Sequence, residues 1–410
     1  MKRALGILLL LVLVLGLVSL PAFAEKAELN LKYWHAGIGG ADLWVADCEE
    51  YEVLYVEGED PYDYYYPGDL LASEKLVLRF GTGTSFILSG SYLISPSVSL
   101  DVSYWSLSRS DKVSKALDYP GEKLEGEFVD DEDDTYTYIG EWSDSYYRIR
   151  LPWSYETEGF WSWYWKWLWS DVTCQEESYE GVIIGQGDFS MSALDILGTK
   201  DLTGFGWEVG LSGGIRKASF DQSQLVGLKT FYEWWDEYPT YYDYSLSEGE
   251  KGSVYLDSTL SLSAIGPQVG FEGTYALADK LVLKAGAKAG LLFGTAKTHA
   301  EITHDPWEYY WDGEEEVFVG WVPVEGAYFK KEYPSTTDTI RFSTYDLSVD
   351  LAYQITEQWS VEAGYYASIW SGVPSLVEVS VDADHFITWK KPEARTVTVS
   401  GLTIGANFKF

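Results

Sequence analysis

The sequence has few basic residues and few histidines, and it has no long apolar run apart from one at its N-terminus. Its 410 residues contain 29 Lys and Arg against 64 Asp and Glu, a net charge of -35. Such a chain is repelled by phosphates, so nucleic acid is excluded as a partner. After residue 24 no apolar run is long enough for a membrane helix. Any part of the chain that spans a membrane must therefore span it as strands.

Linear catalytic and metal-binding motifs are also missing. Of the four histidines, His304 precedes Asp305 and His385 follows Asp384, and no His-Glu-x-x-His occurs. The one Gly-x-Ser-x-Gly match, Gly210 to Gly214, lies inside an alternating strand pattern and is not a strand-to-helix elbow. We therefore predict that the protein is not an enzyme, with no cofactor and no metal centre; a barrel hydrolase is the less favoured alternative. Cys48 and Cys174 are the only cysteines, and a disulfide between them is a hypothesis for an exported chain.

The first 24 residues have the features of a secretory signal. Lys2 and Arg3 precede an apolar run from Ala4 to Leu20, and Ala22-Phe23-Ala24 forms a small-x-small site. We predict cleavage after Ala24, which leaves 386 residues (410 minus 24) as one domain, 25–410. The alternative is a retained membrane anchor.

The last residues form an amphipathic strand that ends on an aromatic residue. In "TVTVSGLTIGANFKF" one face carries Leu402, Ile404, Ala406, Phe408 and Phe410, and the other is polar. This ending resembles the signal by which bacterial outer-membrane barrels are recognised for insertion. It implies outer-membrane lipid and the barrel-insertion machinery as partners and Phe410 as the insertion signal.

Period-two alternation of apolar and polar residues recurs along the chain, as in "LSVDLAYQIT", a tight "EQ" and "WSVEAGYYASIW". We expect an all-β, transmembrane, antiparallel up-and-down barrel of about ten strands, because short and long connections alternate strictly. The expected strands are residues 26–39, 75–93, 97–109, 186–198, 205–219, 253–277, 281–298, 339–354, 358–371 and 395–410. The expected long loops are residues 40–75, 109–186, 219–252, 299–338 and 372–393.

One expected strand changes its apolar face midway. Leu260 and Leu262 share a face before Gly266-Pro267, whereas Val269 and Phe271 continue on the other phase. Glycine followed by proline inside a strand predicts a β-bulge at this point.

Two hairpins carry a family resemblance. The segment "SLSAIGPQVGFEGTYALADKLVLKAGAKAGLLFG" resembles a hairpin of the Legionella-type major outer-membrane protein family, and "LDILGTKDLTGFGWEVGLSGGIRKASF" is similar to the preceding one. The loops depart from that family, and its cysteine pattern is missing. The resemblance implies a pore-forming or structural surface barrel.

The polar phase of the expected strands predicts the residues that face the lumen, with equal numbers of basic and acidic side chains. They are Lys32, Arg79, Asp101, Asp195, Glu208, Arg216, Glu272, Lys284, Lys288, Asp350, Glu362 and Lys409. Such balance suits a narrow lumen, where charges must be paired. Two interpretations stay open: a network that plugs the barrel, and a water-filled path for small solutes.

The acidic excess lies in the long loops and is densest at Asp130, Asp131, Glu132, Asp133 and Asp134. This run is either a solvated acidic loop or a site for divalent cations, and the missing ligand spacing favours the solvated loop.

The aromatic stretch "FWSWYWKWLWS" places Trp161, Trp163, Trp165, Trp167 and Trp169 on one face of a strand. With "YYRIRLPWSYETEG" it predicts a hairpin that extends the barrel wall outward. The alternatives are a twelve-stranded barrel and a stacking platform for glycans.

These features predict an outer-membrane barrel that acts as a cation-preferring pore for small solutes or as a structural surface protein. The alternative is an adhesin-like binding module whose acidic, aromatic-rich loops bind cations, glycans or a surface layer.

Overall fold

The computed structural model describes residues 27–56, 64–117, 122–129, 135–152, 158–169, 174–204, 207–237, 245–312, 317–324, 328–381 and 387–410. The predicted signal peptide and the acidic run from Asp130 to Asp134 lie outside these residues. Within the described part of the chain, no helix is long and apolar enough to cross a membrane.

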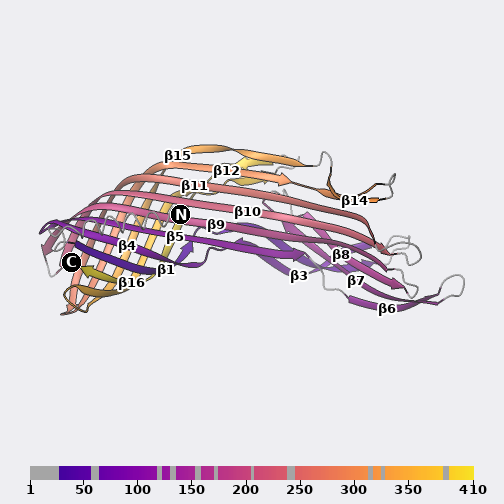
Figure 1. Ribbon diagram of the computed structural model, residues 1–410, viewed down its shortest axis with the longest axis horizontal. Coiled ribbons are helices and arrows are strands. Elements are labelled where there is room, and N and C mark those ends of the chain that lie inside the picture. Colours follow the sequence, from indigo (N-terminus) through magenta and orange to yellow (C-terminus); the bar gives the residue numbers. More distant parts are fainter. Residues whose placement is uncertain are drawn as a thin grey trace.

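Ten of the described strands form a closed antiparallel ring (Figure 1). In ring order they are β1 (Ala27–Gly39), β4 (Thr82–Ser95), β5 (Val98–Leu117), β9 (Cys174–Gly204), β10 (Trp207–Glu237), β11 (Ser245–Ala278), β12 (Leu281–His304), β15 (Phe329–Gln354), β16 (Trp359–Pro374) and β19 (Ala394–Lys409). β1 pairs with β4 on one side and with β19 on the other, which closes the ring. The predicted ten-stranded barrel is confirmed, and the twelve-stranded alternative is wrong because β5 pairs directly with β9.

Both ends of the described chain lie at the end of the barrel with the short turns. The backbone N–H of Phe410 donates to the carbonyl of Ala27 over 3.0 Å. The short connections after β4, β11 and β15 also lie at this end, which we call the short-turn end.

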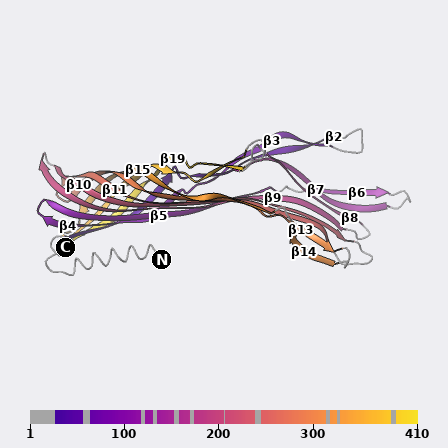
Figure 2. The same ribbon diagram turned by 90° about the horizontal axis from the view of Figure 1, so that it is seen from above.

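At the other end the strands continue far beyond the ring (Figure 1). β11 has 34 residues, so it is roughly 110 Å long at about 3.3 Å per residue, whereas a tilted strand crosses a bilayer with about ten residues. The connections predicted as loops contain further strands: β2 (Leu43–Val56), β3 (Tyr64–Leu78), β6 (Glu122–Val129), β7 (Thr135–Arg150), β8 (Glu158–Trp169), β13 (Trp307–Asp312), β14 (Val317–Pro323), β17 (Glu378–Val381) and β18 (Ile387–Lys390). Away from the ring, the branch that contains β2 and β3 separates from the branch that contains β13 and β14 (Figure 2), and β17 and β18 form a separate two-stranded sheet.

The tryptophan-rich stretch is strand β8. It pairs with β7, where Trp161 lies opposite Tyr146, and its far part pairs with β9. The predicted hairpin that extends the wall is thereby confirmed. A stacking role for its tryptophans stays a prediction.

The change of apolar face on β11 is not a bulge. The pairing of β11 with β12 keeps one register across Gly266 and Pro267, since Ile265 faces Phe293 and Gln268 faces Gly290. The predicted bulge is therefore wrong. Instead, the large apolar side chains from Ile265 to the short-turn end point outward and are exposed, whereas the apolar side chains beyond Ile265 point inward and are buried.

The same reversal occurs around the ring. Away from the short-turn end, the last exposed apolar residues are Ile215, Ile265, Phe293, Tyr345 and Leu402, and beyond them follow the buried apolar residues Ala218, Ala264, Ala296, Phe342 and Val399. On the short-turn side the outer surface is apolar and the interior is polar, as a barrel wall in lipid requires. Beyond the reversal the wall is polar outside and apolar inside, as in a soluble β-protein. The reversal therefore marks the border of the lipid-facing band.

Beyond this border the interior is filled by the connection between β1 and β4. Ala41, Val45, Leu78 and Phe80 are buried in one apolar cluster with the inward side chains of the ring. The side-chain amides of Gln222 and Gln224 on β10 donate to the carbonyls of Ala41 and Trp44 over 2.8 and 2.6 Å.

The chain enters the interior through Gly40, whose φ of 74° is left-handed. A Cβ there would lie 2.1 Å from the carbonyl oxygen of Thr396, so this turn requires glycine.

Candidate functional site in the barrel interior

The predicted lumen-facing residues follow the inward phase of the ring strands, with one exception. Arg79 precedes β4 in the connection from β3, and its side chain is exposed. The prediction for Arg79 is wrong because the ring strand begins at Thr82 and not at residue 75. Lys409 lies at the mouth, 3.8 Å from the carboxylate of Glu28.

Nearest the short-turn end, four of the predicted residues form one charge network. Lys32 contacts Asp350 at 2.8 Å and Glu362 at 3.1 Å, and Lys284 contacts Glu362 at 2.5 Å. Asn30 donates a further hydrogen bond to Glu362 over 2.8 Å. Two cations therefore balance two carboxylates, as burial requires.

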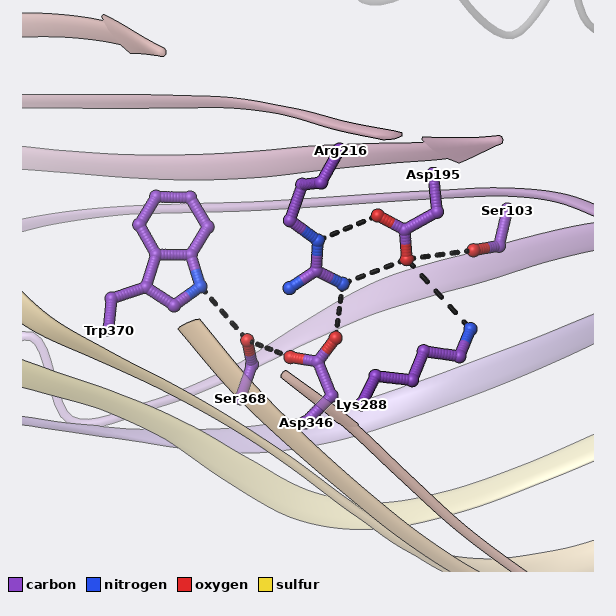
Figure 3. A network of polar contacts seen from close by, with 7 residues as sticks. All are labelled: Ser103, Asp195, Arg216, Lys288, Asp346, Ser368 and Trp370. Carbon is purple, nitrogen blue, oxygen red and sulfur yellow. Dashed lines mark hydrogen bonds and ion pairs between the residues drawn. The ribbon is translucent and has the colours of Figure 1, made fainter. Parts of the chain in front are cut away.

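A second network lies further into the barrel (Figure 3). The guanidinium of Arg216 donates to both oxygens of Asp195, over 2.6 and 2.8 Å, and also to Asp346. Lys288 lies 3.9 Å from Asp195, and Ser368 donates to Asp346 over 2.6 Å. Two cations again face two carboxylates. Arg216 is 0% exposed and both aspartates are 3% exposed, so the ion pairs between them are fully buried.

Asp346 is missing from the predicted set although it shares the polar phase of Asp350. The signal that could have found it is this phase, since Asp346 precedes Asp350 by two alternations on β15. Its pairing with Arg216 joins residues 130 positions apart in the chain, which no local pattern shows.

An aromatic layer covers the Arg216 network. Trp34 packs edge-to-face against Trp105 and Tyr366, with ring centroids 5.5 and 5.0 Å apart. Trp370 contacts Trp105 and Phe342 at 6.0 and 5.6 Å. The indole N–H of Trp370 donates to Ser368 over 3.0 Å, which fixes the layer to the network beneath it (Figure 3).

The interior thus has an open part and a closed part. The side chains of Lys284 and Lys288 are 35% and 33% exposed, and Glu272 is exposed as well. Trp34 and Trp370 are 0% exposed. The exposed part therefore lies toward the short-turn end, and the interior is packed closed at the Arg216 pairs and the aromatic layer.

The other predicted sites are not brought together. Cys48 on β2 is a free, buried thiol, so the hypothesis of a disulfide with Cys174 is wrong. Among the described residues no three His, Cys, Asp or Glu side chains are grouped to hold a metal ion. The candidate cation-binding run lies outside the described residues.

Comparison with known proteins shows likeness in fold only. No protein-family model matches the chain, and no curated protein matches it. The resemblance to the Legionella-type family is therefore not confirmed.

Among solved structures, the outer-membrane protease OmpT of Escherichia coli is 10% identical, with 94% of this chain and 97% of that chain covered and a TM-score of 0.33. A Pseudomonas aeruginosa FadL homologue is 10% identical, with 94% and 91% covered and a TM-score of 0.23. The Pseudomonas putida toluene transporter TodX is 6% identical, with 94% and 90% covered and a TM-score of 0.21.

These neighbours correct one prediction. The missing linear catalytic motifs predict a protein that is not an enzyme, yet a protease is among the matching barrels. The prediction is thereby corrected: a missing linear motif is no ground for excluding catalysis, because strands can bring residues distant in the chain together. The identities and TM-scores assign no activity to this chain.

Proposed function

We propose that the protein is an outer-membrane barrel with a closed interior that anchors an ordered external β-structure, and that it acts as a structural surface protein through that external part. The sequence leaves a pore and a structural barrel open as alternatives. The observation that favours the structural barrel is the aromatic layer, in which Trp34 and Trp370 have no exposed surface.

The energetics support a closed state. A solute that crosses this level must displace packed indole and phenyl rings and also the buried pairs of Arg216 with Asp195 and Asp346. Separating such buried partners costs several kcal/mol. The apolar cluster around Ala41 and Phe80 fills the next part of the interior, so a path past the rings would meet a second packed layer.

The extent of the β-structure beyond the lipid-facing band favours a function in that external part. The wall continues as hydrogen-bonded sheet well beyond the lipid-facing band, and β2 to β3 and β6 to β8 add strands to it. The outer-membrane location and the outward orientation of this part belong to the proposal; the lipid-facing band and the closed ring support them.

The test is conductance in planar lipid bilayers, with folded protein first separated from unfolded chains. We expect no stepwise current from the wild-type barrel under conditions in which a sixteen-stranded porin, used as the positive control, conducts. Reproducible channels from folded protein would contradict the proposal. Their reversal potential under a salt gradient would then test the cation preference that the acidic loops predict.

A further inference from the structure

The outer surface just beyond the lipid-facing band differs from the rest of this acidic chain. On five consecutive ring strands, β9 to β12 and β15, the first outward residues beyond the reversal are hydroxyl-bearing or basic. Together with the next outward residues, Ser219 on β10 and Arg341 on β15, we call them the collar: Ser192, Lys217, Ser219, Ser263, Thr295, Ser343 and Arg341. None of these seven is acidic, although acidic residues outnumber basic ones 64 to 29 in the chain.

Lys217 and Arg341 are placed as interfacial cations. Both are exposed. Lys217 lies between Leu194 and Ile265 on the neighbouring strands, and Arg341 lies opposite Phe293. No ion-pair partner for either residue occurs among the described side chains. A cation at the upper edge of a lipid-facing band can extend its charged group to the level of lipid phosphates.

Above the collar the outer surface is hollowed into a groove of about 870 Å³ that crosses six strands. Asp188, Asp221, Lys297 and His299 line it together with serines and threonines. The hydroxyl of Ser261 donates to Asp221 over 2.6 Å, which fixes the orientation of that carboxylate. Carboxylates held between hydroxyl groups, with lysine and histidine nearby, can both accept and donate hydrogen bonds. Sugar hydroxyl groups suit such a surface.

The height of the groove selects among lipids. Ser261 lies four residues beyond Ile265 (265 minus 261) on β11, which corresponds to roughly 10 Å along the membrane normal for a strand tilted by about 40°. The polar region of an ordinary bilayer leaflet is about 5 to 7 Å thick. A phospholipid headgroup therefore ends below the groove, whereas a larger sugar headgroup reaches it.

We propose that the collar and the groove bind the phosphorylated sugar headgroup of an outer-leaflet glycolipid. Lys217 and Arg341 contact its phosphates, and the groove around Asp221 contacts its sugar hydroxyls. The site rests on the outer-membrane location and outward orientation of the proposed function but not on whether the barrel conducts, so its failure and the failure of the closed barrel are distinguishable.

The test measures the dissociation constant of a fluorescent, bis-phosphorylated disaccharide lipid for the folded, delipidated protein in detergent. The double substitution Lys217→Gln and Arg341→Gln should weaken binding about 30-fold, because each cation near a lipid phosphate contributes about 1 kcal/mol. The matched control, Lys200→Gln with Lys280→Gln, removes the same charge from exposed positions near the short-turn end and should leave binding unchanged. Unfolding curves verify that both variants fold.

A second variant separates the sugar from the phosphate. Asp221→Asn should weaken binding of the disaccharide lipid but not of phosphatidic acid, which carries a phosphate and no sugar. Equal binding by wild type and the double variant would overturn the proposal. Equal affinity for the two lipids would also overturn it, because it would show a general anionic-lipid surface. Displacement of the disaccharide lipid by a soluble polysaccharide without phosphate or lipid would overturn it as well.

Discussion

Removing the Arg216 guanidinium tests whether the interior depends on paired charges. With Arg216 present, its network holds two cations and two carboxylates. Arg216→Met leaves Asp195 with Lys288 at 3.9 Å, and it leaves Asp346 with the hydroxyl of Ser368 but no cation among the described ion pairs. The substituted network thus carries one unbalanced negative charge on Asp346, which is 3% exposed.

An uncompensated buried charge of this kind costs about 3–5 kcal/mol. We therefore expect Arg216→Met to lower the free energy of unfolding by that amount. The matched control is Lys75→Met, an exposed lysine on β3 away from the lipid-facing band, which should change it by less than about 0.5 kcal/mol. Adding Asp195→Asn and Asp346→Asn to Arg216→Met should recover most of the loss, since no charge then stays unpaired.

The assay is equilibrium urea unfolding of the barrel in lipid vesicles, followed by the fluorescence of its 19 tryptophans, with the denaturant slope compared between variants. If Arg216→Met stays within about 1 kcal/mol of the wild type, the reasoning is refuted. Failure of the triple variant to recover stability would show that the loss comes from packing.

Two further predictions concern the lipid border and the buried thiol. Leu347→Lys, on the exposed outer phase of β15 inside the band, should lower the free energy of unfolding in vesicles by about 2–4 kcal/mol. Thr337→Lys, on the same phase beyond the border, should leave it nearly unchanged. Equal losses for the two variants would show that the border is assigned wrongly. Burial raises the pKa of the Cys48 thiol from 9.0 to about 11, so the folded protein holds this proton more tightly than the unfolded chain. Its contribution to stability should be full below pH 9 and decline toward pH 11 by about 2 kcal/mol, a decline that Cys48→Ala should remove in pH-dependent unfolding.

The sequence determined the ring strands and their phase because both are local properties. Alternation with a period of two places Leu402 and Ile404 on one surface and Thr403 on the other in any extended strand. Short turns then fix which strands are neighbours. For the same reason the alternation alone predicts that Arg216, Asp195 and Glu362 face inward.

Alternation alone does not show whether the apolar residues of a strand are buried inside the protein or face lipid. Leu262 is buried by protein and Phe271 faces outward in the lipid-facing band, yet both are apolar residues of the same strand. The sequence therefore suggests a bulge at Gly266-Pro267, whereas the strand continues unbroken through a change of surroundings. Only the closed ring shows where the lipid-facing band ends.

Contacts across the barrel were likewise decided only by the tertiary structure. The pair Arg216 and Asp346, the layer of Trp34, Trp105 and Trp370, and the buried connection at Ala41 join segments far apart in the chain. Whether inward residues enclose a path or a packed core depends on the volume that these segments fill together. That volume is a property of the closed barrel, because no single strand contains the side chains that face it from the opposite wall.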